Sequence, residues 1–196
     1  MKKTVMTFTL LCAALAATNV YAAEPGMEET IGFVRDRLAG CGAFTQRKSD
    51  PDAPWNSNTT YRWKTIILSN GGTLTAEEEV YDSISLNAGP EYGFPDKAEA
   101  SLVAGGYKVN NHREATRSRT ETGEFKLADL STEVTVNTEK GLSVGIKCSG
   151  GSCVHANGHL SNGWNFETCG SQEDAERIAK ALRHAIELAG GKKPLF

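Results

Sequence analysis

The sequence predicts an α+β fold: a bent antiparallel β-sheet or barrel, capped by a C-terminal α-helix and preceded by a short N-terminal helix. Several segments alternate apolar and polar residues with a period of two, which is typical of strands. Residues 172–189 instead place apolar side chains at three- and four-residue steps, which is typical of a helix with one apolar face. Such a face has to be buried, and the sheet offers the large apolar surface against which it can pack.

The first twenty-two residues predict a secretory signal peptide. Lys2 and Lys3 precede an apolar run from about Val5 to Ala17, and Val20-Tyr21-Ala22 provides the small-residue spacing of a cleavage site. The apolar run is too short to cross a hydrocarbon layer of about 30 Å. We therefore expect residues 1–22 to be removed and the remaining chain to lie, without a membrane anchor, in a bacterial periplasm or outside the cell.

Residues 23–196 have the length of a single domain. Without the two leader lysines, 19 basic residues stand against 24 acidic ones, which gives a formal net charge of −5. A mildly acidic chain is a poor ligand for nucleic acid or anionic lipid. The charge therefore favours a partner that is neither nucleic acid nor an anionic membrane.

Four cysteines remain after residue 22, and an even number in an oxidising compartment predicts two disulfides with three possible connectivities. We favour Cys148–Cys153, which would close the turn Ser149-Gly150-Gly151-Ser152, and Cys41–Cys169, which would tie the first helix to the start of the last. A zinc site made of Cys148, Cys153, His155 and His159 is the alternative. An oxidising compartment favours the disulfides, so no metal or other cofactor is predicted.

The individual elements follow from local patterns. Residues 27–39 form a helix with Ile31, Val34 and Leu38 on one face, and residues 45–58 form a polar loop. The next strand places Tyr61, Trp63, Thr65 and Ile67 on one face, and Asn70-Gly71-Gly72 turns the chain into a strand from Thr73 to Tyr81.

The second half contains the clearest strand and the clearest helix. Short strands are expected within residues 125–137, from Leu142 to Cys148, from Cys153 to Ala156, and through Trp164, Phe166 and Thr168. Ser171 and Asp174 form a capping-box pattern at the start of the 172–189 helix. Residues 82–122 are expected to form a loop-rich insertion in which Asp96 to Ala104 can be a short helix.

The order of these elements resembles a pleckstrin-homology-like barrel. The segments Leu127-Ala128-Asp129-Leu130-Ser131, Val144 to Cys148 and Asp174 to Leu182 look like exported bacterial proteins of that shape. The resemblance implies a bent sheet of about seven strands closed at one end by the final helix. It covers about residues 27–81 and 123–190, and it implies a shape rather than an activity.

Aromatic residues on loops are the first candidate binding residues: Trp55, Tyr92 and Phe94. Prolines brace the loops that carry them, and aromatic side chains bury a large area at low entropic cost. The alternative is that these side chains pack onto the domain and hold their loops in place. Arg113, Arg117 and Arg119, with His112, form a basic cluster that would suit an acidic partner or a cell-wall polyanion, although neighbouring glutamates favour a solvated loop instead.

Known catalytic motifs such as His-Glu-x-x-His or Gly-x-Ser-x-Gly are absent from the sequence, and no catalytic residue is predicted. The favoured function is therefore non-enzymatic: an exported module that binds another envelope or secreted protein, for example a periplasmic inhibitor or immunity protein. The alternatives are an envelope hydrolase with its site under residues 82–122, and a small-ligand carrier that uses the barrel mouth. A concave pocket lined by several carboxylates would favour the hydrolase.

Overall fold

The computed structural model describes residues 24–48, 55–86, 93–139 and 141–192. The predicted signal peptide lies outside these residues. In chain order the elements are α1 (Met27–Gly40), β1 (Ala43–Lys48), β2 (Trp55–Ser69), β3 (Thr73–Leu86), α2 (Asp96–Ala104), β4 (Lys108–Asn110), β5 (Glu114–Lys126), the 3₁₀ turn η1 (Leu127–Asp129), β6 (Thr135–Asn137), β7 (Ser143–Lys147), β8 (Val154–Ala156), β9 (His159–Ser161), β10 (Gly163–Glu167) and α3 (Gln172–Leu188).

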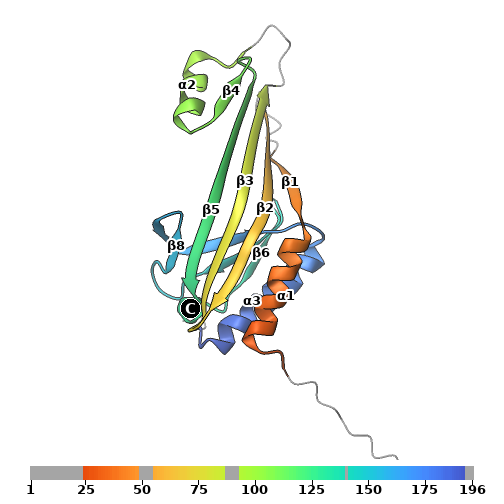
Figure 1. The fold of residues 1–196 in the computed structure, drawn as a ribbon, viewed down its shortest axis with the longest axis vertical. Coiled ribbons are helices and arrows are strands. Elements are labelled where there is room, and N and C mark those ends of the chain that lie inside the picture. The colour runs from red at the N-terminus through yellow and green to blue at the C-terminus, as the bar shows by residue number, and fades with distance from the viewer. Residues whose placement is uncertain (1–23, 49–54, 87–92, 140, 193–196) are drawn as a thin grey trace, which may run out of the picture.

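The described strands form two antiparallel sheets, and the predicted α+β class is confirmed (Figure 1). The large sheet has the order β1-β2-β3-β5-β8-β9, with β4 paired to β5, and the small sheet has the order β10-β7-β6. The large sheet is bent and does not close on itself, so the bent sheet, rather than the barrel, is the form that the chain adopts.

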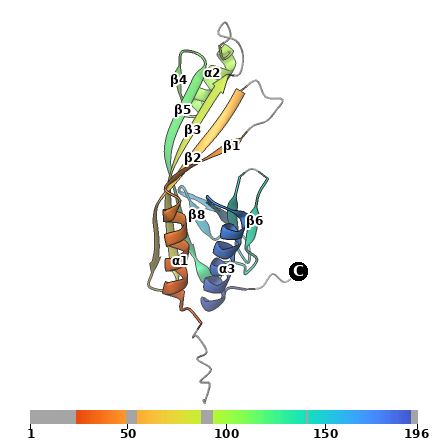
Figure 2. The same ribbon diagram turned by 90° about the vertical axis from the view of Figure 1, so that its right-hand side faces the viewer.

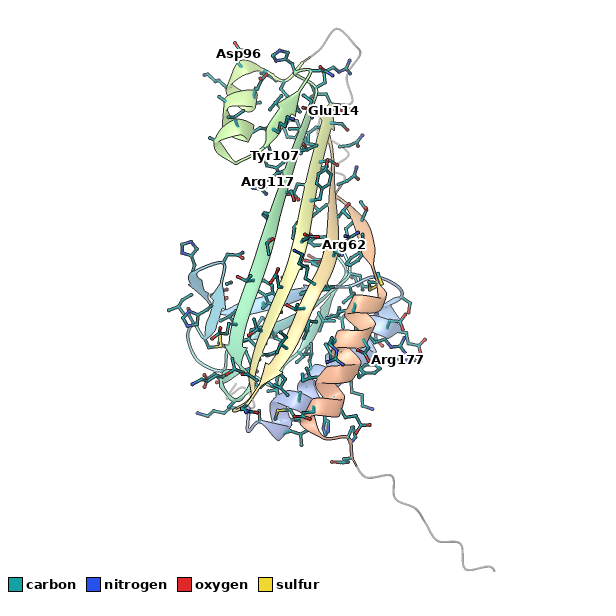
Figure 3. The ribbon with its side chains drawn as sticks, in the orientation of Figure 1. Arg62, Asp96, Tyr107, Glu114, Arg117 and Arg177 are labelled. Carbon is teal, nitrogen blue, oxygen red and sulfur yellow. A yellow bond between two sulfur atoms is a disulfide. The ribbon has the colours of Figure 1, made fainter. Side chains whose placement is uncertain are left out.

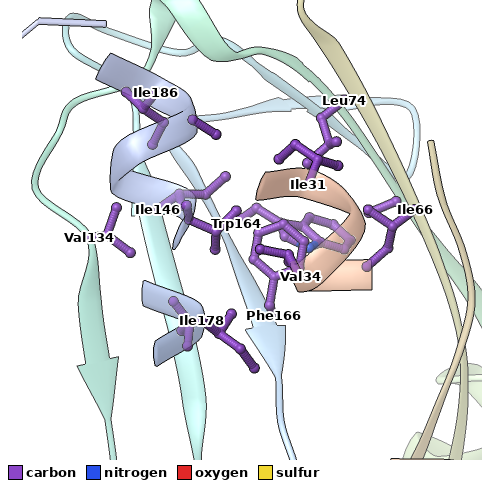
Figure 4. Close-up of a cluster of buried hydrophobic side chains, with 14 of the residues drawn as sticks. Ile31, Val34, Ile66, Leu74, Val134, Ile146, Trp164, Phe166, Ile178 and Ile186 are labelled. Atoms are coloured by element: carbon purple, nitrogen blue, oxygen red, sulfur yellow. The ribbon is translucent and has the colours of Figure 1, made fainter. Parts of the chain in front are cut away.

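The core lies between the lower half of the large sheet, the two long helices and the small sheet (Figure 2). Helix α1 packs on β2 and on α3, and α3 packs on β6 and β7. Both helices and both sheets contribute buried side chains, including Ile31, Val34, Ile66, Leu74, Ile146, Phe166, Ile178 and Ile186 (Figure 4). The apolar faces predicted for both helices are therefore the faces that the fold buries.

The alternation predicted for β2 is wrong beyond Trp63, because β2 contains a β-bulge. Trp63 pairs with Glu78 and Thr65 pairs with Glu77, so Lys64 is an extra residue without a partner in register. The extra residue reverses the alternation. Ile66 is therefore buried, whereas Ile67, which was predicted to share a face with Tyr61 and Trp63, is exposed.

The predicted capping box at the start of α3 is confirmed. The Ser171 hydroxyl accepts a hydrogen bond from the Asp174 backbone N–H at 3.2 Å, and the Asp174 carboxylate accepts one from the Ser171 backbone N–H at 3.3 Å. These bonds satisfy donors that have no partner within the helix. The hydrogen bonds from Ser171 also lower the pKa of Asp174.

Both disulfides form with the pairing favoured from the sequence. Cys41, just after α1, is bonded to Cys169, two residues before the cap of α3, with 5.6 Å between the Cα atoms. Cys148 and Cys153 are bonded across the predicted turn, with 5.7 Å between the Cα atoms. The first bond therefore joins the two helices that cover the core.

Two segments predicted to be loops are strands. The first is the expected loop of residues 45–58, where β1 occupies residues 43–48 and β2 begins at Trp55. The second is the polar run of residues 110–122, in the second half of the expected insertion, which contains most of β5. The short helix expected in the same insertion is present as α2, with the expected bounds. The polar strands lie mainly in the arm, which we define as residues 55–60, 81–86 and 114–119 together with α2 and β4. The arm extends past the helices and the small sheet (Figures 1 and 2), so its strands need no apolar face.

Candidate functional site

A line of polar side chains crosses the large sheet where the arm joins the core. Thr59, Asp82 and Arg117 are register partners on β2, β3 and β5, and Trp63, Glu78 and Glu121 are register partners four residues nearer the core. Alternate residues of a strand share a face, so all six project from the face that carries the core. The strands therefore place ionisable groups directly beside the apolar interior.

Asp82 is the centre of the upper part of this line. Its carboxylate accepts hydrogen bonds from Thr59 Oγ1 at 3.0 Å, from Arg117 Nη2 at 2.8 Å and Nε at 3.2 Å, and from Arg119 Nη1. Asp82 is only 7% exposed, and burial by itself raises the pKa of its carboxyl. The hydrogen bonds and the charges of the two arginines outweigh burial and lower that pKa.

Arg117 joins this cluster to the helix of the arm (Figure 3). Its guanidinium lies 4.5 Å from the centre of the Tyr107 ring, and its Nη1 donates to the Gly105 carbonyl oxygen at 3.0 Å. Gly105 and Tyr107 lie between α2 and β4. Asp82 and Arg117 therefore hold the α2–β4 segment against the sheet.

Replacing Asp82 by Asn should lower the free energy of unfolding by about 2–3 kcal/mol, because two half-buried guanidinium groups lose the buried charge with which they pair. Urea unfolding at neutral pH measures the loss. The matched control is Glu79→Gln: Glu79 is on the same strand, pairs with Lys64 at 2.9 Å and is well exposed, so its loss should change stability by less than about 1 kcal/mol. Equal effects of the two variants would contradict the structural role given to Asp82.

Below this cluster lies a pocket of about 520 Å³ between the large sheet, the small sheet and the β8–β9 hairpin. Its wall contains three glutamates, two cations, two aromatic residues and several amides. They are Glu78, Glu121, Glu167, Arg119, Lys147, Tyr61, Trp164, Asn157, Asn162 and Asn165. The volume lies within the range of about 300–1,000 Å³ that is usual for ligand sites.

Glu78 is the most perturbed acid in the pocket. It is 2% exposed, and its Oε2 has no hydrogen-bond partner among the described residues. Burial, followed by the charges of Glu121 and Glu167, raises the pKa of Glu78 to about 8, and the charge of Arg119 opposes this rise. Glu78 is therefore mainly protonated at neutral pH.

The other acids in the pocket have partners. Glu121 accepts a hydrogen bond from Arg119 Nε at 2.6 Å, and Glu167 accepts one from Gln46 Nε2 at 3.2 Å. Burial, followed by the charge of Glu167, raises the pKa of the Tyr61 hydroxyl, so Tyr61 stays neutral. The pocket thus combines a neutral carboxylic acid with carboxylates that are already paired.

The aromatic residues predicted for binding lie in different environments. Trp55 is 44% exposed at the free end of β2, whereas Phe94 is 7% exposed and packs within the protein. Phe94 therefore matches the alternative of packing onto the domain, and its backbone N–H donates a hydrogen bond to the carbonyl oxygen of His112. Tyr92 lies outside the described residues.

The predicted basic cluster is divided between β5, which carries Arg117 and Arg119, and the turn before it, which carries His112 and Arg113. Arg117 and Arg119 point to the core side and pair with Asp82, so they are neither a free basic surface nor part of a solvated loop. Arg113 is half-buried at the tip of the arm. His112 is exposed and lies 2.7 Å from Glu99, whose hydrogen bond raises the pKa of the imidazole.

Sequence reasoning missed Asp82, Glu78 and Tyr107. A signal for Glu78 was present, because Leu74, Ala76 and Val80 alternate in the strand predicted from Thr73 to Tyr81 and Glu78 falls on the same face. Asp82 continues that face by one more step.

The alternative zinc site is excluded, because Cys148 and Cys153 are bonded to each other and have no thiolate to offer.

Comparisons with protein-family models, with curated proteins and with solved structures find no match. Among the described residues no helix is both long enough and apolar enough to cross a membrane.

Proposed function

We propose that this protein is an exported module of the bacterial cell envelope that binds another protein, in the manner of a periplasmic inhibitor or immunity protein. Two disulfides are typical of proteins in an oxidising compartment. The predicted signal peptide agrees with this location. The acidic chain favours a protein partner over nucleic acid or an anionic membrane.

The observation that carries the proposal is the arm. Three long strands continue past the part of the sheet that the helices and the small sheet cover (Figure 2), although the described core clusters around the lower half. The extension is held in shape by the Asp82 cluster rather than by an apolar interior. It presents Trp55 near its end, and tryptophan is among the residues that most often anchor protein interfaces.

Replacing Trp55 by Ala should weaken capture of the partner by about 30-fold or more, as expected for an interface anchor. The free energy of unfolding should change by less than about 0.5 kcal/mol because the side chain is exposed. The measurement is affinity capture from envelope extract and culture medium with the mature, oxidised protein as bait, followed by titration of the captured protein against both forms.

Leu160→Ala is the matched control for this experiment. Leu160 is a large apolar residue, 62% exposed, on β9 rather than on the arm. Its replacement should leave capture unchanged. If Trp55→Ala binds the captured protein as well as the wild type does, the arm is not the binding surface.

The pocket favours a second candidate, an envelope hydrolase. A neutral carboxylic acid beside other carboxyl groups is a combination with which hydrolases donate and accept protons, and Glu78 lines the pocket with Glu121 and Glu167. Incubation with fluorogenic glycosides and esters tests this candidate. Turnover that falls about 100-fold or more in Glu78→Gln would favour it; turnover that is the same in both forms would exclude this pocket as its source.

A further inference from the structure

Two residues that line the pocket beneath the Asp82 cluster each carry a polar atom that no described residue satisfies. Glu78 Oε2 and the indole Nε1 of Trp164 are both buried and have no hydrogen-bond partner among the described residues. Both side chains line the pocket and both are more than nine-tenths buried. Native proteins rarely leave buried polar groups unpaired, so a pair of them in one pocket points to a bound molecule.

The charges around the pocket argue against an ionic ligand. Glu121 is paired with Arg119, which is also paired with Asp82, and Lys147 adds a second cation to the wall. A cation would meet these two positive groups and an anion would meet the glutamates. No cluster of His, Cys, Asp and Glu in the described parts of the chain has the geometry to hold a metal ion.

The hydrogen-bonding chemistry of the two unpaired atoms restricts the class of ligand further. An indole N–H is only a donor, so it needs an acceptor, whereas a carboxylic acid or carboxylate can accept and, when protonated, donate. An ammonium or guanidinium group has no acceptor and would leave Trp164 unsatisfied. A hydroxyl group donates and accepts, and adjacent hydroxyls can serve both atoms at once. Rotation of the carboxyl about its last bond, which has a broad torsional range, presents either oxygen to the pocket.

Trp164 is also held in a fixed position. Atoms of its ring lie 3.0 Å from the place that a Cβ on Gly123 would occupy, so the indole rests directly on the backbone of β5. Asn157, Asn162 and Asn165 add amide groups around the same space. An indole provides an apolar surface next to its N–H, and amides provide further donors and acceptors. This combination suits a ring with hydroxyl groups at its edge and C–H groups on its faces.

We propose that this pocket binds a neutral saccharide unit through Glu78 and Trp164. Binding of a saccharide in this pocket depends neither on capture of a protein by the arm nor on turnover of the ligand in the pocket.

The test uses the indole N–H signals of the mature, oxidised protein in proton–nitrogen NMR spectra. Trp164→Phe assigns the signal of Trp164. Trp63 and Trp55 are internal references, because Trp63 Nε1 already donates to the Glu167 carbonyl oxygen at 2.7 Å and Trp55 lies on the arm. The probes are N-acetylglucosamine, its β-1,4 dimer, glucose and cellobiose, with lysine amide and acetate as charged controls.

At least one saccharide should shift the Trp164 signal in a saturable manner at concentrations below about 10 mM. The same saccharide should not shift the Trp55 signal, and the charged controls should not shift the Trp164 signal. Glu78→Leu removes the carboxyl and should weaken binding about 10-fold or more. Glu78→Gln keeps a donor and an acceptor and should bind within about 3-fold of the wild type. This pair separates loss of the hydrogen bond from loss of the fold.

Three results would overturn the proposal: no saccharide shifts the Trp164 signal, a charged control shifts it instead, or Glu78→Leu binds the saccharide as well as the wild type does. A crystal structure with a single water molecule bonded to both atoms, in the presence of the saccharides, would identify water as the only occupant.

Discussion

Replacing both Cys41 and Cys169 by Ser is expected to lower the free energy of unfolding by about 5 kcal/mol. The bond closes a loop with a sequence separation of 128 residues, and the entropy that a disulfide removes from the unfolded chain increases with loop length. For a domain of this size the loss corresponds to a decrease in melting temperature of about 10–20 °C. Urea unfolding in buffer without reductant measures it.

The second disulfide supplies the matched control. Cys148→Ser with Cys153→Ser opens a loop with a separation of only 5 residues, and the same entropic relation gives about 2 kcal/mol. Equal losses for the two pairs would mean that loop entropy in the unfolded chain does not determine their contributions. A larger loss for the short loop would indicate that the β8 region depends on its disulfide for its native conformation.

Stability should fall as the pH rises from about 4.5 to about 8, because Glu78 is buried as a neutral acid. The pKa of Glu78 is about 8 in the folded protein and 4.5 for an unperturbed glutamate. The folded state therefore binds the proton more tightly than the unfolded state does. This contribution to stability is fully present below pH 4.5 and is lost as the pH rises through 8. Its total size is about 3–5 kcal/mol.

Glu78→Gln isolates this contribution. The amide does not titrate in this range, so the variant should gain about 3–5 kcal/mol relative to the wild type between pH 4.5 and pH 8.5. Urea unfolding of both proteins at each pH gives the difference. Glu79→Gln, on the exposed face of the same strand, should follow the wild-type pH dependence. Parallel curves for Glu78→Gln and the wild type would show that Glu78 is already ionised in the fold.

The sequence predicts the apolar half of the molecule well, because the side chains that are buried there recur in the sequence with the period of a helix or a strand. The stripes of α1 and α3, the capping box at Ser171 and both disulfides are found as expected. The arm has no such periodicity, because polar residues occupy both faces of its part of β5. Residues 110–122 therefore have the composition of a loop. The resemblance to a pleckstrin-homology-like shape remains a prediction.

The candidate site was less predictable than the fold. Asp82, Arg117 and Arg119 meet only because β3 and β5 pair in one register, and a single sequence carries no information about long-range register. Trp164 lies in a strand that the sequence predicts, and it is buried. Its unpaired Nε1 depends on how the small sheet approaches β5, which local patterns do not specify.

The bulge at Lys64 divides β2 into two halves of opposite parity. Odd-numbered residues such as Tyr61 and Trp63 are buried before it, and even-numbered Ile66 is buried after it. Inserting or deleting one residue elsewhere in β2 would therefore put one half out of phase with β3 and turn either the polar cluster or the apolar core to solvent. The extra residue at position 64 therefore allows one continuous strand to place both its polar half, in the arm, and its apolar half, in the core, on the same face of the sheet.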